Sequence, residues 1–188
     1  MSENRVIGAN NGIPWHIPDD FRWFKECTEN QIVVLGRKTY DSLKKKPLPR
    51  RENWVLTHRD LFMFNPDPLI RTFRSLEKLE QTAEGQNNKQ IWICGGAEIY
   101  KQYLPRCRDL FLTKIKRTVT GDRFFPEFEN IFTEKKVLKE TDEFKIVWYV
   151  NSAPKRITQD LIEASFPKDQ ENIEEKTIEQ LAFSFFNI

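Results

Sequence analysis

The sequence predicts an α/β domain with a mainly parallel central sheet, flanking helices and a C-terminal antiparallel hairpin. Short apolar runs alternate with helical segments along most of the 188 residues. The run at 31–35 is wholly apolar and rich in β-branched residues, which is typical of a strand buried on both faces. The segments 133–140 and 144–150 flank Thr141-Asp142-Glu143 and indicate an antiparallel pair.

Each predicted element follows from a local signal. Glycines and prolines interrupt residues 4–18, which predicts a loop there. Pro18, Asp19 and Asp20 suit the first turn of a helix. Ser75 is a plausible N-cap. In chain order we expect a loop at 4–18, a helix at 18–30, a strand at 31–35, a helix at 37–43, a loop at 44–51, strands at 54–56 and 69–73, a helix at 75–84, a strand at 90–94, a helix at 97–103, a strand at 110–115 and the hairpin strands.

The composition changes after the hairpin. We therefore assign residues 1–150 to the main domain and 151–188 to a C-terminal extension. Within the extension, residues 167–180 are acidic and polar, whereas 181–188 are apolar again. No internal repeat is evident along the chain.

Charge and composition exclude several classes of protein. The chain has 30 Lys and Arg and 28 Asp and Glu, a net charge of +2, which does not fit a protein that covers nucleic acid or a membrane surface. Three cysteines without CxxC spacing and only two histidines argue against a zinc site and fit a reducing cytoplasm. Residues 1–5 lack a signal-peptide core, and no apolar run is long enough to span a membrane.

Three strand ends carry residues that suit a phosphate-rich ligand. They are Gly36-Arg37-Lys38-Thr39, Thr57-His58-Arg59 and Gly95-Gly96. Ligands of open α/β sheets bind at the carboxyl ends of strands, and basic residues there favour NADPH over NADH. The strict GxGxxG pattern is absent, and each piece alone has a plainer interpretation: Gly36 as a turn glycine, and Arg37 and Lys38 as a solvated helix start.

The carboxylate of Asp20 lies on the apolar stripe of the first predicted helix, whereas Asp19 is expected to point toward water. Asp20 is either a second capping acid or a half-buried carboxylate that faces a ligand, with a pKa raised by desolvation. Such a group accepts two hydrogen bonds from an amidine-like ring edge. Helical spacing places Asp20 on one face with Trp23, Phe24, Cys27 and Thr28.

The loop at 8–18 contains Trp15 near its centre. This aromatic either anchors the loop in the core or belongs to a lid that excludes water from a hydride-transfer site.

Taken together, the sequence resembles the dihydrofolate reductase family over about residues 4–150. The matching stretches occur in the family's order and spacing. They are Val6-Ile-Gly8, Ile13-Pro-Trp15, Asp20, Phe24-Lys25, Gly36-Arg-Lys-Thr39, Pro47-Leu-Pro49, Arg51, Ile93-Cys-Gly-Gly96, Tyr100, Gly121-Asp122 and Phe125-Pro126.

The resemblance implies an NADPH-dependent oxidoreductase that converts 7,8-dihydrofolate to tetrahydrofolate for one-carbon metabolism. A hydride would reach C6 and a proton N5, in a cytoplasmic monomer without a metal. The implied catalytic residues are Asp20, Trp15 and Thr113. The implied substrate-binding residues are Ile13, Phe24, Leu43, Leu48, Arg51 and Cys94. The implied cofactor-binding residues are Gly36, Arg37, Lys38, Thr39, Ser42, Thr57, His58, Gly95, Gly96, Ala97 and Tyr100.

One feature departs from the family, which normally begins with an apolar strand just before the segment that matches residues 4–8. Only Met1-Ser2-Glu3 precede that segment here. Three explanations are open: Met1 is internal to a longer natural chain, the chain is a shortened form with a defective site, or the apolar segment 181–188 fills the vacant place. The alternative for that segment is packing on the outside of the domain.

Two other functions are open at this stage. A related reductase domain of riboflavin synthesis would share the fold, but is expected to lack the set Asp20, Phe24 and Arg51. A catalytically impaired nucleotide- or folate-binding remnant is the non-enzyme alternative.

Overall fold

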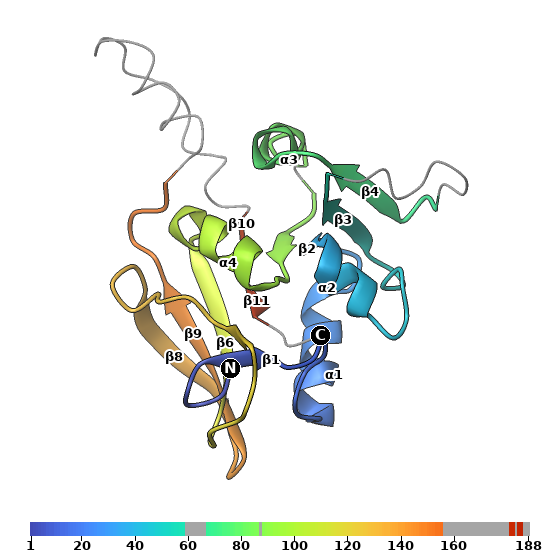
Figure 1. Cartoon of the computed structure of the whole chain (residues 1–188). Coiled ribbons are helices and arrows are strands. Elements are labelled where there is room, and N and C mark those ends of the chain that lie inside the picture. Colours follow the sequence, from blue (N-terminus) through green and yellow to red (C-terminus); the bar gives the residue numbers. More distant parts are fainter. Residues whose placement is uncertain (59–66, 87, 156–180, 183, 186–188) are drawn as a thin grey trace.

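The computed structural model describes residues 1–58, 67–86, 88–155, 181–182 and 184–185. The described residues form three sheets and four α-helices, arranged as in Figure 1. The elements are β1 (Val6–Gly8), α1 (Pro18–Thr28), β2 (Ile32–Gly36), α2 (Arg37–Ser42), β3 (Glu52–Leu56), β4 (Ile70–Phe73), α3 (Leu76–Ala83), β5 (Ile91–Ile93), α4 (Ala97–Tyr103), the short 3-10 helix Leu104–Arg106, β6 (Asp109–Ile115), β7 (Arg123–Phe124), β8 (Thr133–Glu140), β9 (Phe144–Val150), β10 (Leu181–Ala182) and β11 (Ser184–Phe185).

The strand order confirms the predicted fold class. One sheet has the order β10-β5-β2-β3-β4 and is wholly parallel. A second sheet has the order β11-β6-β9-β8, in which β6, β9 and β8 run antiparallel, and a small third sheet consists of β1 and β7. The mainly parallel part and the C-terminal hairpin therefore both occur as expected.

The segment of β2 is apolar because helices cover both faces of the strand. Ile32 and Val34 pack with residues of α3 and α4, whereas Val33 and Leu35 pack with Phe24 of α1 and with α2. Successive side chains of a strand point to opposite faces, so helices on both sides bury the positions from Ile32 to Leu35.

Three predictions need correction, the first being that β3 begins at Glu52 rather than at residue 54. The loop expected at 4–18 contains β1, which pairs antiparallel with β7. Local patterning could not show this short strand, because its partner lies more than a hundred residues away. Helix α1 ends at Thr28 rather than at residue 30, since Glu29 is extended and Asn30 has a left-handed φ of 62°. At α3, the expected Ser75 cap accepts from the Lys78 backbone N–H.

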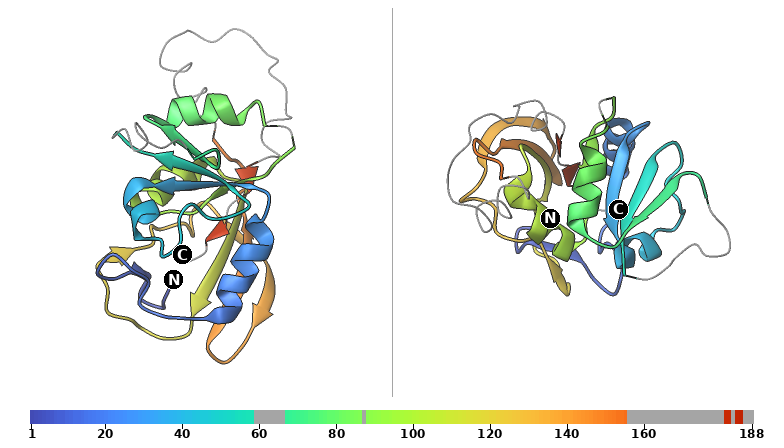
Figure 2. Two further views of the ribbon diagram at one scale, coloured as in Figure 1. Left: turned by 90° about the vertical axis from the view of Figure 1, so that its right-hand side faces the viewer. Right: turned by 90° about the horizontal axis from the view of Figure 1, so that it is seen from above.

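The apolar tail does not pack on the outside of the domain. β10 pairs with β5 and β11 pairs with β6, both in parallel, so the tail lies between the two sheets (Figures 1 and 2). The four residues described in the segment 181–188 therefore pair with β5 and β6, as the third explanation predicts for them. The acidic stretch at 167–180 and Arg59 lie outside the described residues.

Candidate active site

Asp20 is buried against the second sheet and hydrogen-bonded to Thr113. It lies in the first turn of α1 with an exposed fraction of 2%. The hydroxyl of Thr113, from β6, donates to Asp20 Oδ1 at 2.6 Å. Burial raises the pKa of Asp20 to about 6, although the Thr113 hydrogen bond and the Met1 amino group oppose the rise. A carboxyl group of this kind gains and loses a proton close to neutral pH.

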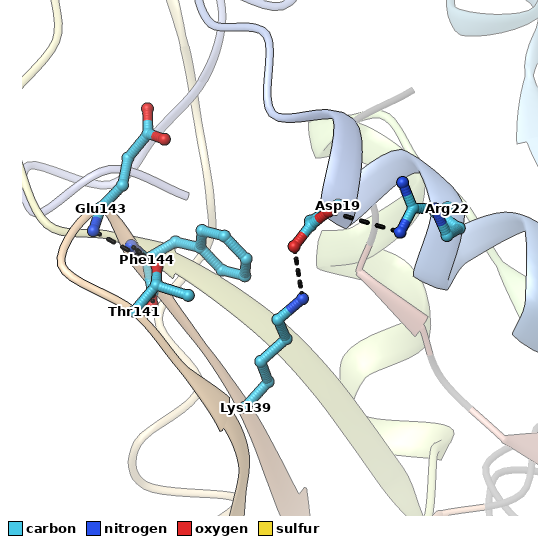
Figure 3. Close-up of polar contacts among 6 residues, drawn as sticks. All are labelled: Asp19, Arg22, Lys139, Thr141, Glu143 and Phe144. Carbon is cyan, nitrogen blue, oxygen red and sulfur yellow. Dashed lines mark hydrogen bonds and ion pairs between the residues drawn. The ribbon is translucent and has the colours of Figure 1, made fainter.

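The neighbouring carboxylate behaves in the opposite way. The Asp19 side chain is 42% exposed and accepts a hydrogen bond from Lys139 Nζ at 2.6 Å. Arg22 forms a second ion pair with it at 3.7 Å. Figure 3 shows Asp19 between these two cations, with Lys139 reaching from β8 beside Phe144. The Lys139 contact lowers the pKa of Asp19. Adjacent acids thus have environments that separate their protonation states.

Trp15 is buried in a small apolar cluster beside the acid's end of α1. The cluster includes Ile17 of the same loop, and Val6, Ile115 and Phe144 from three strands; Ile13 packs against its edge. The indole Nε1 is buried, and it has no hydrogen-bond partner within the described part of the chain. Trp15 therefore anchors the loop in the core and also holds an unused donor.

A buried arginine from the segment before β3, Arg51, contacts the C-terminal end of α1. Arg51 Nε donates to Thr28 Oγ1 at 2.8 Å, and its other nitrogens donate to the carbonyls of Pro49 and Lys25. The guanidinium also lies over the Phe24 ring, 5.5 Å from its centre. All three of these hydrogen-bond acceptors are neutral.

Spacing along α1 gives this face its length. Asp20, Phe24 and Thr28 are its buried residues and recur every four positions. Eight residues at about 1.5 Å each place Asp20 and Thr28 roughly 12 Å apart along the axis. The face therefore offers a carboxyl at one end, an aromatic ring in the middle and a guanidinium at the other end.

Leu43 and Leu48 flank this face from the loop between α2 and β3. Leu43 is buried among the same apolar residues as Phe24, and Leu48 packs against that cluster. Asn53 holds the loop, because its side chain accepts from the Leu48 N–H at 2.9 Å and donates to the Leu48 carbonyl at 3.0 Å.

The first two predicted phosphate-binding segments lie at neighbouring strand ends. Parallel register places Gly36 opposite Leu56, so α2 begins next to Thr57. Arg37 is oriented by Asp41, with Nη1 and Oδ2 at 2.5 Å. Lys38 and His58 are exposed, Thr39 is half-buried, and the exposed Ser42 donates to the Thr39 carbonyl.

The third segment joins the same edge. The N–H of Gly36 donates to the Gly95 carbonyl at 2.7 Å, and Cys94 is buried directly after β5. Gly95 has a φ of 94°, and a Cβ on it would lie 2.7 Å from the buried Tyr100 ring. A Cβ on Gly96 would lie 2.9 Å from Thr39 Oγ1. Only glycines allow this close approach of backbone and side chains ahead of Ala97.

Sequence reasoning missed several supporting contacts. Thr28 and Asn53 hold Arg51 and Leu48 in place, and Lys139 neutralises Asp19. The Met1 nitrogen donates to the Thr113 carbonyl at 2.5 Å. Asn53 had a weak local signal, as a polar residue directly before the apolar run 54–56.

No helix among the described residues has the length and apolar character to cross a membrane. No group of three or more His, Cys, Asp or Glu side chains there could hold a metal ion.

Comparison with known proteins gives one consistent result. A family model described as "Dihydrofolate reductase" matches residues 1–151. The dihydrofolate reductase of Buchnera aphidicola (from Acyrthosiphon pisum) is 39% identical over 129 residues, which cover 69% of this chain and 76% of that protein. The Neisseria gonorrhoeae protein of the same description is 37% identical over 155 residues, covering 79% and 93%.

A solved structure is similar as well. The dihydrofolate reductase from Enterococcus faecalis, complexed with NADP(H) and RAB-propyl, superposes with a TM-score of 0.71 at 30% sequence identity. The superposition covers 81% of this chain and 92% of that one.

Proposed function

Since this chain belongs to the dihydrofolate reductase family, we propose that it reduces 7,8-dihydrofolate to 5,6,7,8-tetrahydrofolate with NADPH, through the residues described above. The observation that carries the assignment of residues is the buried face of α1. The carboxyl of Asp20, the ring of Phe24 and the adjacent guanidinium of Arg51 match the order of a bicyclic amidine-like ring, an aromatic linker and a carboxylate in dihydrofolate.

Asp20 binds and supplies protons in this proposal. Its carboxylate accepts two hydrogen bonds from the amidine-like edge of the ring, and its protonated form provides the proton that N5 gains. Because burial raises its pKa to about 6, both forms are accessible near neutral pH. The free donor of Trp15 is suited to orient a water molecule that carries the proton to N5.

The other end of the substrate is gripped by Arg51. Its planar guanidinium suits a carboxylate in a bidentate geometry, and the glutamate of dihydrofolate provides one. Phe24 and Leu48 would pack against the linker, with Leu43 behind them. The ring amino group would reach the Cys94 carbonyl, and Ile13 and Trp15 would close the loop over the site.

The strand-end residues fit NADPH. Gly95 and Gly96 bring the backbone close to Tyr100 and Thr39 without side chains of their own, which suits a pyrophosphate beside Gly36, Thr39, Ser42 and Ala97. Arg37, Lys38, Thr57 and His58 would surround the 2′-phosphate, and Tyr100 would lie beside the nicotinamide. When bound, NADPH supplies the hydride that reaches C6.

Biological context follows from the reaction. The product is a carrier for one-carbon metabolism, and we place the protein in the cytoplasm as a monomer. Three free cysteines, Cys27, Cys94 and Cys107, support a reducing compartment. The impaired binding remnant is not favoured, because Asp20 and Thr113 are assembled and the relatives are reductases.

Purified protein tests the proposal directly. NADPH absorbance should fall when dihydrofolate is added, tetrahydrofolate should accumulate in equal amount, and methotrexate should block both changes. Binding of NADPH without turnover of dihydrofolate would overturn the assignment.

A further inference from the structure

Within the described part of the chain, backbone pairing between the parallel sheet and the sheet that contains β6 runs only through the C-terminal tail. No strand of the parallel sheet pairs directly with β6, β8 or β9. β10 pairs with β5 and also lies beside β6, whereas β11 pairs with β6 and also lies beside β5. We call residues 181–182 and 184–185 the bridging segment; Figure 2 shows its two short arrows between the sheets.

The strands on either side of this segment are deeply buried. Ile91 and Ile93 of β5, and Leu110 and Leu112 of β6, are all at most 1% exposed. Backbone N–H and C=O groups on such strands need partners, since a buried unpaired group is costly. A strand between β5 and β6 meets that need for both.

Register places the bridging segment at the edge where the candidate site lies. Ala182 is opposite Trp92, two residues before Cys94. Phe185 is opposite Leu112, one residue before Thr113. Because all these strands are parallel, the segment runs toward the carboxyl edge that carries both groups.

The proposed ligand-binding residues divide between the two sides of the segment. Gly36 ends a strand of the parallel sheet and Thr57 and Gly95 follow two others, whereas Thr113 belongs to β6 and holds Asp20. We propose that the bridging segment positions these two halves of the active site relative to one another. This inference rests on the proposed function for its kinetic consequence, but the strand pairing does not.

The strand between β5 and β6 comes from the tail of the same chain. Residues 156–180 separate it from the end of the main domain, and at about 3.3 Å per residue they can span roughly 80 Å. That reach exceeds what a domain of this size requires, so a second copy is not needed.

Hydrogen exchange on the full chain tests the pairing. We expect protection of the amides of Ile91–Ile93 and of residues 110–112 that face the segment. Ala182→Pro and Ser184→Pro each remove a backbone N–H from the segment and should abolish that protection. Amides of β3, which pairs with β2 and β4, should keep theirs and serve as the internal reference.

Kinetics on the same variants tests the positioning. In both proline variants kcat should fall about 10- to 100-fold, because the proton donor and the cofactor lie on opposite sides of the segment. The Kd for NADPH should stay within about threefold of the parent's value, because the residues proposed to bind NADPH lie at the ends of strands of one sheet. The controls Ala182→Ser and Ser184→Ala keep the N–H and should match the parent.

Each contrary result has a definite meaning. Unprotected β5 and β6 amides in the parent would overturn the pairing, and a dimer on gel filtration would overturn assignment to the same chain. Unchanged kcat in the proline variants, or equal losses in the controls, would overturn the positioning role. An inactive parent with protected amides would contradict the proposed function while leaving the pairing intact.

Discussion

The hydroxyl of Thr113 donates to Oδ1 of Asp20 across 93 residues of sequence. Alternation along β6 places Thr113 on the same face as Phe111, which packs against the cluster that contains Phe24 of α1. The helix contributes the acid from its first turn on the same buried side. Two ordinary periodicities thus bring a titratable group and its hydrogen-bond partner into the core.

Replacing Asp20 should impair catalysis and leave cofactor binding intact. We expect Asp20→Asn to lower kcat/KM for dihydrofolate about 10²- to 10⁴-fold near neutral pH, because the amide cannot supply a proton. The Kd for NADPH should barely change. Steady-state kinetics and fluorescence titration measure the two quantities. Asp19→Asn is the matched control, since Asp19 is exposed and paired with Lys139; equal losses in both variants would contradict the role of Asp20.

Asp20 should also make stability depend on pH. Its folded pKa of about 6 lies above the ordinary value of 3.8, so the folded chain holds a proton that the unfolded chain releases. The free energy of unfolding should therefore fall as pH rises from about 4 to about 6, by roughly 3 kcal/mol from this group. Relative to the parent, Asp20→Asn should gain stability across that window in urea unfolding.

In the same experiment, Asp19→Asn should change the pH dependence of the free energy of unfolding in the opposite direction. The pKa of Asp19 is lowered by Lys139, so its contribution is present at neutral pH and is lost as pH falls through the folded pKa. Relative to the parent, Asp19→Asn should therefore be less stable at neutral pH, and this difference should shrink as pH falls. Parallel curves for all three proteins would be evidence against the separation of the two acids.

Arg37 should distinguish the two nicotinamide cofactors. Arg37→Ala should weaken NADPH binding about tenfold or more, because a charge-assisted contact to the 2′-phosphate is lost. NADH, which lacks that phosphate, should bind almost as before. The Kd values come from fluorescence titration, with Arg117→Ala as an exposed control paired with Glu143. Similar losses for both cofactors would remove Arg37 from the phosphate site.

Arg51 should act on only one part of the substrate. Arg51→Lys should raise KM for dihydrofolate about tenfold, because an ammonium cannot form a bidentate contact with the glutamate carboxylate. A dihydropteroate substrate without glutamate should be affected little. The neighbouring Arg50→Lys is the control, since that side chain is exposed and paired with Glu29. An equal rise with both substrates would indicate general disruption.

The sequence could predict most strands and helices because their signals are local. The apolar run of β2 and the cap at Ser75 depend only on nearby residues, and both lie within a residue or two of the predicted positions. Strand β1 could not be found, since three residues become a strand only when β7 pairs with them. The same holds for the tail, whose place depends on β5 and β6.

For the candidate site, the buried face was predictable and its supports were not. Helical spacing places Asp20 with Phe24 and Thr28, as the structure has them. Thr113 came only from the resemblance, because its contact depends on how β6 packs against α1. The hydrogen bonds of Asn53 to Leu48 and of Lys139 to Asp19 require the folded chain.

The central claim concerns the protonation state of Asp20, and its carboxyl carbon reports that state directly. A carbon-13 NMR titration of the ligand-free chain, with the resonance assigned by its loss in Asp20→Asn, should give a midpoint near 6. Thr113→Val should raise the midpoint further, since the hydrogen bond from Thr113 stabilises the charged form. A midpoint near the ordinary value of 3.8 in the parent would contradict the account.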